Sequence, residues 1–290
     1  VVRPTAPRTR WPRCRPRPLR ACAMAALPAP TISAEVAAAH PEQARMASTT
    51  TVRLEGLGAG KLALVADAYH EGSPILPDLL GDRPFVEWEH YPASDYFDAP
   101  SGIVAFYHAH SPDGRTDVEH GHFHCFVEVS DLSAPSPVAR PRTRKGRRLC
   151  HLVAVSVDMA GVPQRLFVPN QWVTGEWLYA AEWCAPLLRR FAALPANAPR
   201  PLRWVALLVA IFEPQVRALL AERDRWLGRG RPARRRAGDR DLEIICQTPL
   251  DIGAQLSAIA REKSRRRNAR RAARSSEPGR TAQLSPLPAL

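Results

Sequence analysis

The chain has 290 residues, of which 45% are hydrophobic and 24% are charged, and its formal net charge is +13. The charge is confined to the ends, because residues 1–46 carry a net +6, residues 261–290 carry +7, and the stretch between them is neutral. A neutral centre argues against a core that binds nucleic acid specifically, since such a core presents a basic face. The apolar run Trp204–Phe212 is far too short to span a bilayer, so we expect no transmembrane segment.

Composition divides the chain into three segments. Residues 1–46 are rich in Pro, Arg and Ala and lack apolar periodicity, so we expect them to be disordered. Two explanations for them stay open, a disordered extension and an over-long gene model whose true start is Met24 or Met46. We expect residues 47–262 to form one domain, and residues 263–290 to be a disordered basic tail that contacts anionic surfaces weakly.

The first half of the domain changes from helical to strand-like patterns. Leu62–Leu80 predicts one or two short helices, and the alternation in Phe85–Tyr91 predicts a strand. Residues 92–102 read PASDYFDAPSG and predict a turn-rich loop. Ile103–His110 and Glu119–Glu128 then predict an antiparallel hairpin with a long connection that contains Pro, Asp and Gly.

The second half adds another hairpin and then helices. His151–Asp158 and Gln164–Asn170 read as strands, and Leu242–Cys246 is a candidate for a last one. Apolar residues recur at helical spacing over Trp177–Phe191 and Trp204–Ile211. We therefore expect an α+β fold, in which an antiparallel sheet of about five strands is covered on one face by the C-terminal helices.

Five of the nine histidines lie in the first predicted hairpin. Side chains of a strand alternate between its two faces, so His108 and His110 share one face, and His120, His122 and His124 share one face. If His110 lies opposite His120, then His108 lies opposite His122 and all five histidines form one patch. A shift of one residue would separate the two sets.

Such a patch predicts a site for a divalent metal, Zn²⁺ or Fe²⁺. Neutral imidazole is the commonest metal ligand, and an open catalytic zinc site takes about three protein ligands. We select His108, His110 and His122 as ligands. Three histidines of one strand span roughly 13 Å and cannot bind one ion together. His120 and His124 are therefore assigned as an additional ligand, a proton shuttle or a substrate contact.

Acidic residues near the patch are candidates for orienting the histidines. His90 lies in the first predicted strand and can approach the patch, while Asp95 and Asp98 lie in the predicted loop. As loop acids, the two aspartates more often form turns or face solvent. Strict alternation places Glu119 on the opposite face, so we do not expect it to be a ligand.

Several motifs occur in a fixed order along the domain: WEHYP at 88–92, YHAH at 107–110, EHGHFH at 119–124, RLF at 165–167 and NxWVTGE at 170–176. This series resembles a bacterial family, a domain of unknown function, over roughly residues 60–262. The resemblance implies that both tails lie outside the domain, and it brings no established activity. Its motif positions Asn170, Trp172 and Glu176 are candidates for lining a pocket.

The six cysteines form no C-x-x-C pair, and Cys125, Cys150, Cys184 and Cys246 lie in or beside apolar runs. This pattern is typical of reduced core thiols, so we expect a cytoplasmic protein.

Two functions remain open. The first is a metal-dependent hydrolase or oxygenase, which the open three-histidine geometry favours. The alternative is a non-catalytic protein, whose histidine face binds an unknown small molecule or stabilises the sheet. The expected lack of a carboxylate on the histidine face favours this alternative.

Overall fold

The structure is a computed structural model, and it describes residues 75–82, 84–111, 118–130, 134–141, 146–228 and 232–275. The N-terminal extension with its two methionines and most of the predicted helical region over Leu62–Leu80 lie outside these stretches. Cys14 and Cys22 also lie outside them.

The described chain confirms an α+β fold around one antiparallel sheet, with six strands instead of about five. The strands follow one another in chain order across the sheet. Their bounds are β1 Tyr91–Asp98, β2 Ile103–His108, β3 Gly121–Glu128, β4 Leu149–Val157, β5 Pro163–Pro169 and β6 Ile244–Pro249.

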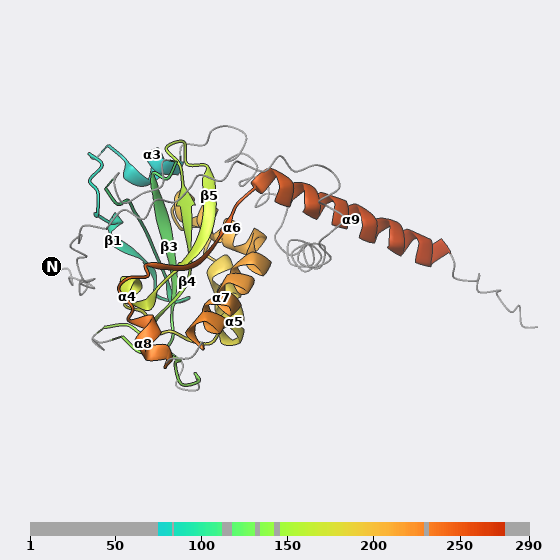
Figure 1. Ribbon diagram of the computed structural model, residues 1–290. Coiled ribbons are helices and arrows are strands. Elements are labelled where there is room, and N and C mark those ends of the chain that lie inside the picture. The colour runs from blue at the N-terminus through green and yellow to red at the C-terminus, as the bar shows by residue number, and fades with distance from the viewer. Residues whose placement is uncertain are drawn as a thin grey trace, which may run out of the picture.

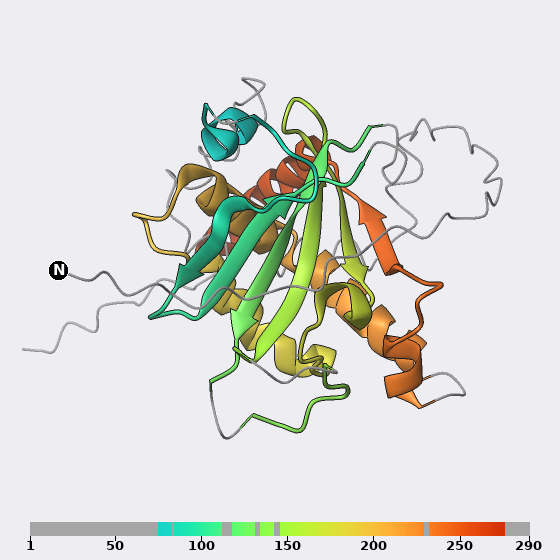
Figure 2. The ribbon, with the colours of Figure 1, turned by 90° about the vertical axis from the view of Figure 1, so that its left-hand side faces the viewer.

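Most helices lie between β5 and β6 in sequence. Figure 1 shows α5, α6 and α7 on one side of the sheet, and Figure 2 shows the sheet from its other side with these helices behind it. The C-terminal helices therefore cover one face, as predicted. The helices are α3 Ile75–Leu80, α4 Gln171–Thr174, α5 Ala181–Ala192, α6 Arg200–Ile211, α7 Glu213–Leu227, α8 Ala233–Ala237 and α9 Ile252–Ser275.

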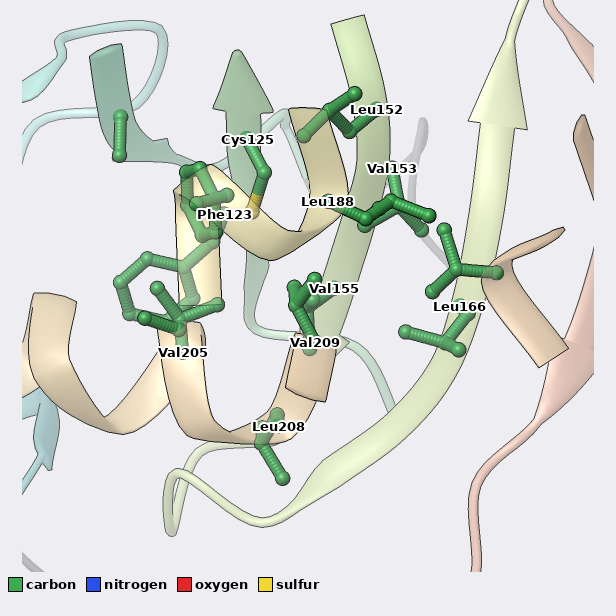
Figure 3. Close-up of a cluster of buried hydrophobic side chains, with 14 of the residues drawn as sticks. Phe123, Cys125, Leu152, Val153, Val155, Leu166, Leu188, Val205, Leu208 and Val209 are labelled. Carbon is green, nitrogen blue, oxygen red and sulfur yellow. The ribbon is translucent and has the colours of Figure 1, made fainter. Parts of the chain in front are cut away.

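The main core lies between the sheet and these helices. In Figure 3, Phe123 and Cys125 of β3 face the same cluster as Leu188 of α5 and Val205 and Val209 of α6. All five are at least 98% buried. Burial of a large apolar side chain contributes about 1.5–3 kcal/mol, so this face of the sheet is fixed by packing. The alternate residues of β3 must then point to the opposite face.

The first strand differs from the prediction. Phe85–Tyr91 was expected to be a strand and 92–102 a loop, but β1 begins at Tyr91 and the chain before it is irregular. Trp88 adopts a left-handed φ of 66°, which interrupts the alternation that we took for a strand. Phe97 pairs with Val104 of β2 and packs on an apolar cluster that continues the histidine face. Tertiary packing thus outweighs the turn-forming residues of this segment.

The segment after residue 262 also differs from the prediction. We predicted disordered chain from residue 263, whereas α9 continues to Ser275. Alanine and arginine are strong helix formers, which explains a helix without apolar periodicity in this segment.

No single helix in the described part of the chain is long and apolar enough to cross a bilayer, and α6 and α7 meet that criterion only as a pair bent by 75°. Cys125, Cys150, Cys184 and Cys246 are buried and outside disulfides.

Candidate metal centre

The pairing of β2 with β3 places the central histidines opposite each other. His108 pairs with His122, and Phe106 pairs with His124, which is the predicted register. The same row continues across the sheet, because His122 pairs with Ser156 of β4 and Ser156 pairs with Arg165 of β5. Directly paired residues share a face, so polar side chains cross the face of the sheet opposite α5, α6 and α7, where His122, His124 and Ser156 are buried.

Three histidines come close enough to bind one metal ion. One ligand atom from each of His108, His122 and His124 lies within 4.8 Å of the others. The Nε2 atoms of His108 and His122 are 2.8 Å apart. Tetrahedral zinc with Zn–N bonds of about 2.0–2.1 Å separates its nitrogens by about 3.4 Å, so small side-chain movements suffice to admit the ion.

The carboxylate of Glu119 holds His122. Its Oε1 lies 2.8 Å from His122 Nδ1, and its Oε2 accepts hydrogen bonds from Ser156 Oγ and Arg165 Nη2 at 2.8 and 2.7 Å. Burial opposes ionisation of Glu119, but the hydrogen bond and charge of His122 and the bonds from Arg165 and Ser156 lower its pKa to about 2. Glu119 is therefore ionised and fixes the His122 tautomer with the proton on Nδ1.

This position of Glu119 corrects two expectations from the sequence. Glu119 lies on the histidine face, and His120 instead points to the helix-covered face, where its Nδ1 is 2.5 Å from the Tyr107 hydroxyl. Gly121 permits the break in alternation, since a Cβ there would lie 2.5 Å from both the Tyr107 hydroxyl and the His108 carbonyl oxygen. The histidine patch thus loses His120 and gains a carboxylate.

His151 of β4 completes the support of the triad, and the sequence did not reveal it. Its Nε2 lies 3.0 Å from His124 Nδ1, and it is completely buried. Burial lowers the pKa of His151 to about 3, so it is neutral and its Nε2 can accept a hydrogen bond from the Nδ1–H of His124. The only signal in the sequence was a polar residue at the start of an apolar strand that neighbours β3.

Two further histidines lie at the edge of the triad. The ring of His110 is 5.0 Å from that of His108 and 5.1 Å from that of His122, and it stacks on Trp88 at 4.4 Å. His90 stacks on Phe106 at 3.8 Å, and its Nδ1 is 2.7 Å from Asp95 Oδ1.

Burial and the neighbouring charges of His122, His110 and His90 lower the pKa of His108, which favours the neutral form that binds metal.

Asp98 does not reach the histidines. Its Oδ2 accepts hydrogen bonds from the backbone N–H and the hydroxyl of Ser101 in the turn after β1. This is the turn-forming role that was the alternative for the loop acids.

Glu243, just before β6, is an acidic neighbour that sequence reasoning missed. Its Oε1 lies 4.0 Å from His110 Nδ1, and it interacts electrostatically with His122 and Glu119. Partial desolvation raises its pKa above the usual value, although half of its side chain is exposed. Because residues 110 and 243 are far apart in sequence, only the folded chain brings this carboxylate to the histidines.

The predicted pocket residues Asn170 and Trp172 hold the segment that carries Glu243. Asn170 Nδ2 donates to the backbone carbonyls of Arg236, Asp239 and Leu242. Trp172 Nε1 donates to the Leu242 carbonyl at 2.9 Å. Their polar groups are therefore occupied by the backbone of the chain itself.

A comparison with known families identifies the domain. The family described as domain of unknown function (DUF6969) matches residues 59–250, about two thirds of the chain. The chain belongs to the DUF6969 family. No curated protein and no solved structure gives a significant match. The DUF6969 segment contains the whole histidine cluster from His90 to Glu243, whereas α9 lies beyond it.

The third pocket candidate, Glu176, is buried beneath the cluster of the DUF6969 domain. It is 1% exposed, and its Oε2 accepts a hydrogen bond from the backbone N–H of His151 at 2.7 Å. Burial raises the pKa of Glu176 to about 8, although the charge of Arg223 opposes the shift.

The Glu176→Gln variant is expected to flatten the pH dependence of stability between about pH 4.5 and 8. A raised folded-state pKa means that the stabilisation is complete below the unfolded pKa and is lost as the pH rises through the folded one. The wild-type unfolding free energy should fall by up to about 1.4 kcal/mol per pH unit in this window. Urea unfolding of both proteins at several pH values tests this, and equal slopes would contradict it.

The Glu119→Gln variant is expected to bind metal about 10–100-fold more weakly, because the carboxylate that orients His122 and raises its basicity is lost. The measurement is competition for zinc between the metal-free protein and a coloured chelator. Asp98→Asn, which alters an acid outside the cluster, is the matched control. An unchanged affinity in Glu119→Gln would show that this carboxylate does not support a metal ligand.

Proposed function

We propose that His108, His122 and His124 bind one divalent metal ion that activates water for a hydrolytic reaction. The proposal rests on the hydrogen bonds made by the Nδ1 atoms of two of these histidines. His122 Nδ1 is bound to Glu119 and His124 Nδ1 to His151, which leaves the Nε2 atoms of both rings for a metal. Outer partners of this kind accompany almost all metal-binding histidines.

The ligand set favours Zn²⁺ over Fe²⁺. Non-haem iron oxygenases use two histidines and one carboxylate, whereas three histidines are typical of catalytic zinc. Within the described residues, the group whose ligand atoms all lie within 4.8 Å of one another contains histidines alone. A zinc ion with three protein ligands retains a position for water and lowers the pKa of that water to about 7.

Residues beside the triad supply groups for proton transfer and substrate orientation. Glu243 and His110 approach each other to 4.0 Å next to the triad. A carboxylate of raised pKa near a metal-bound water can accept its proton and pass it to a leaving group. These roles support an enzyme over a purely structural zinc site, whose four protein ligands exclude water.

One observation favours the non-catalytic alternative. The Nε2 atoms of His108 and His122 are at hydrogen-bond distance from each other, so a neutral pair satisfies both rings without a metal. In that case the cluster is a buried polar network that stabilises the face of the sheet opposite the helices. The two functions differ in two measurable properties. Only the catalytic site binds a metal ion, and only there is one coordination position of the ion open to exchange with solvent.

Cobalt substitution separates these accounts. We would load the metal-free chain with Co²⁺, record the visible spectrum, and add azide as a small anion. The proposal predicts a four-coordinate cobalt spectrum that azide changes, in the wild type and in the control variant His120→Gln. A cobalt spectrum that azide leaves unchanged would contradict water activation, and no cobalt binding would contradict the metal site altogether.

A further inference from the structure

The C-terminal helix α9 has two chemically different parts. At its start, Ile252 and Ile259 are buried, and Gln255 Nε2 donates to the backbone carbonyl of Ile211. Beyond these contacts the helix extends away from the sheet and its helices (Figure 1). Residues 261–275 read REKSRRRNARRAARS, with eight basic residues and one acid.

Most of this positive charge follows one side of the helix. The spacing i, i+3, i+4, i+7, i+8 and i+11 places residues on one helical face. At about 1.5 Å per residue, this face is about 17 Å long. The residues with this spacing, the basic stripe, are Lys263, Arg266, Arg267, Arg270, Arg271 and Arg274.

We propose that the basic stripe of α9 binds the phosphate backbone of duplex DNA without reading its sequence. The stripe carries one positive charge per about 3 Å, and a DNA duplex carries one negative charge per about 1.7 Å of its axis. Arg267 and Arg271 are exposed, as a phosphate contact requires. The stripe lies outside the DUF6969 segment, so this binding does not depend on the metal site.

The composition of the helix favours DNA over the other polyanions. A helix that lies on a membrane needs large apolar side chains opposite its charges, and residues 261–275 contain no apolar residue larger than alanine. The major groove of B-form DNA admits an α-helix, whereas the deep and narrow major groove of A-form RNA does not. Because residues 47–260 are neutral, the body of the protein adds little attraction of its own.

The test is fluorescence anisotropy of the full chain with a labelled duplex of about 20 base pairs at several salt concentrations. Binding to six phosphates predicts a slope of about −5 for log affinity against log salt. A stripe variant replaces four arginines by glutamine, which is also a good helix former. We expect at least tenfold weaker binding and a slope shallower by about four. The stripe variant is R266Q/R267Q/R270Q/R271Q.

A second variant removes the same charge from the body of the protein. Its four arginines are exposed on α5 and α7, so it should bind DNA as the wild type does. The substitutions of this control are R189Q, R190Q, R217Q and R225Q. Equal losses in both variants would show that net charge, and not the stripe, attracts DNA. Equal or tighter binding to duplex RNA or to phosphatidylserine vesicles, or no binding to DNA, would overturn the proposal.

Discussion

The His124→Ala variant is expected to bind zinc more than about 100-fold more weakly than the wild type, because loss of an outer partner alone costs 10–100-fold. His124 belongs to the triad with ligand atoms within 4.8 Å, and its Nδ1 is held by His151. His110→Ala should keep most of the affinity, since His110 lies at the edge of the triad and stacks on Trp88. Competition of the metal-free proteins with a coloured chelator measures both affinities.

This comparison also decides between two ligand sets. The strand pattern alone favours His108, His110 and His122, and the distances favour His124 in place of His110. Loss of zinc in His110→Ala with retention in His124→Ala would support the set from the strand pattern. His120→Gln controls for the loss of a histidine directly before the same strand, because its ring lies on the helix-covered face.

The Arg223→Ala variant is expected to lose about 3–5 kcal/mol of unfolding free energy, a typical cost of breaking a buried charge pair. Arg223 of α7 is completely buried, and its Nη2 donates to the Tyr179 carbonyl and to Asp224 Oδ1. Asp224 Oδ2 in turn accepts the backbone N–H of Ala181 at the start of α5. Removal of the guanidinium leaves the Tyr179 carbonyl without this donor and loosens the contact between the two helices.

Arg225→Ala is the matched control for this prediction. Arg225 lies two residues further along α7 and is exposed, so its loss should change stability by less than about 0.5 kcal/mol. Urea unfolding measures both variants. Similar small effects in the two variants would contradict a structural role for Arg223.

The sequence allowed the centre of the site to be predicted because it depends on local alternation. Apolar residues such as Phe123 and Cys125 fix one face of β3 on the helices, so His122 and His124 must occupy the other. The pairing of His108 with His122 follows from the same pattern across the hairpin.

The surroundings of the site could not be predicted because they depend on exceptions and on distant segments. Glu119 reaches the histidine face through a break in alternation that only the contacts of Gly121 explain. His151 arrives through the pairing of β3 with β4, and Glu243 through a segment that Asn170 holds. The strand β1 was missed because its Pro, Ser and Asp residues favour turns, whereas its pairing with β2 is a tertiary effect.

The most direct test of a metal site is elemental analysis of the full chain, purified without a histidine tag or a chelator. We predict about one equivalent of zinc per chain, since a site of three histidines and water holds a single ion. The His108→Ala/His122→Ala variant should contain none while His120→Gln retains it. A wild-type chain without metal, together with unchanged folding of the double variant, would contradict the account and leave the histidines as a structural network.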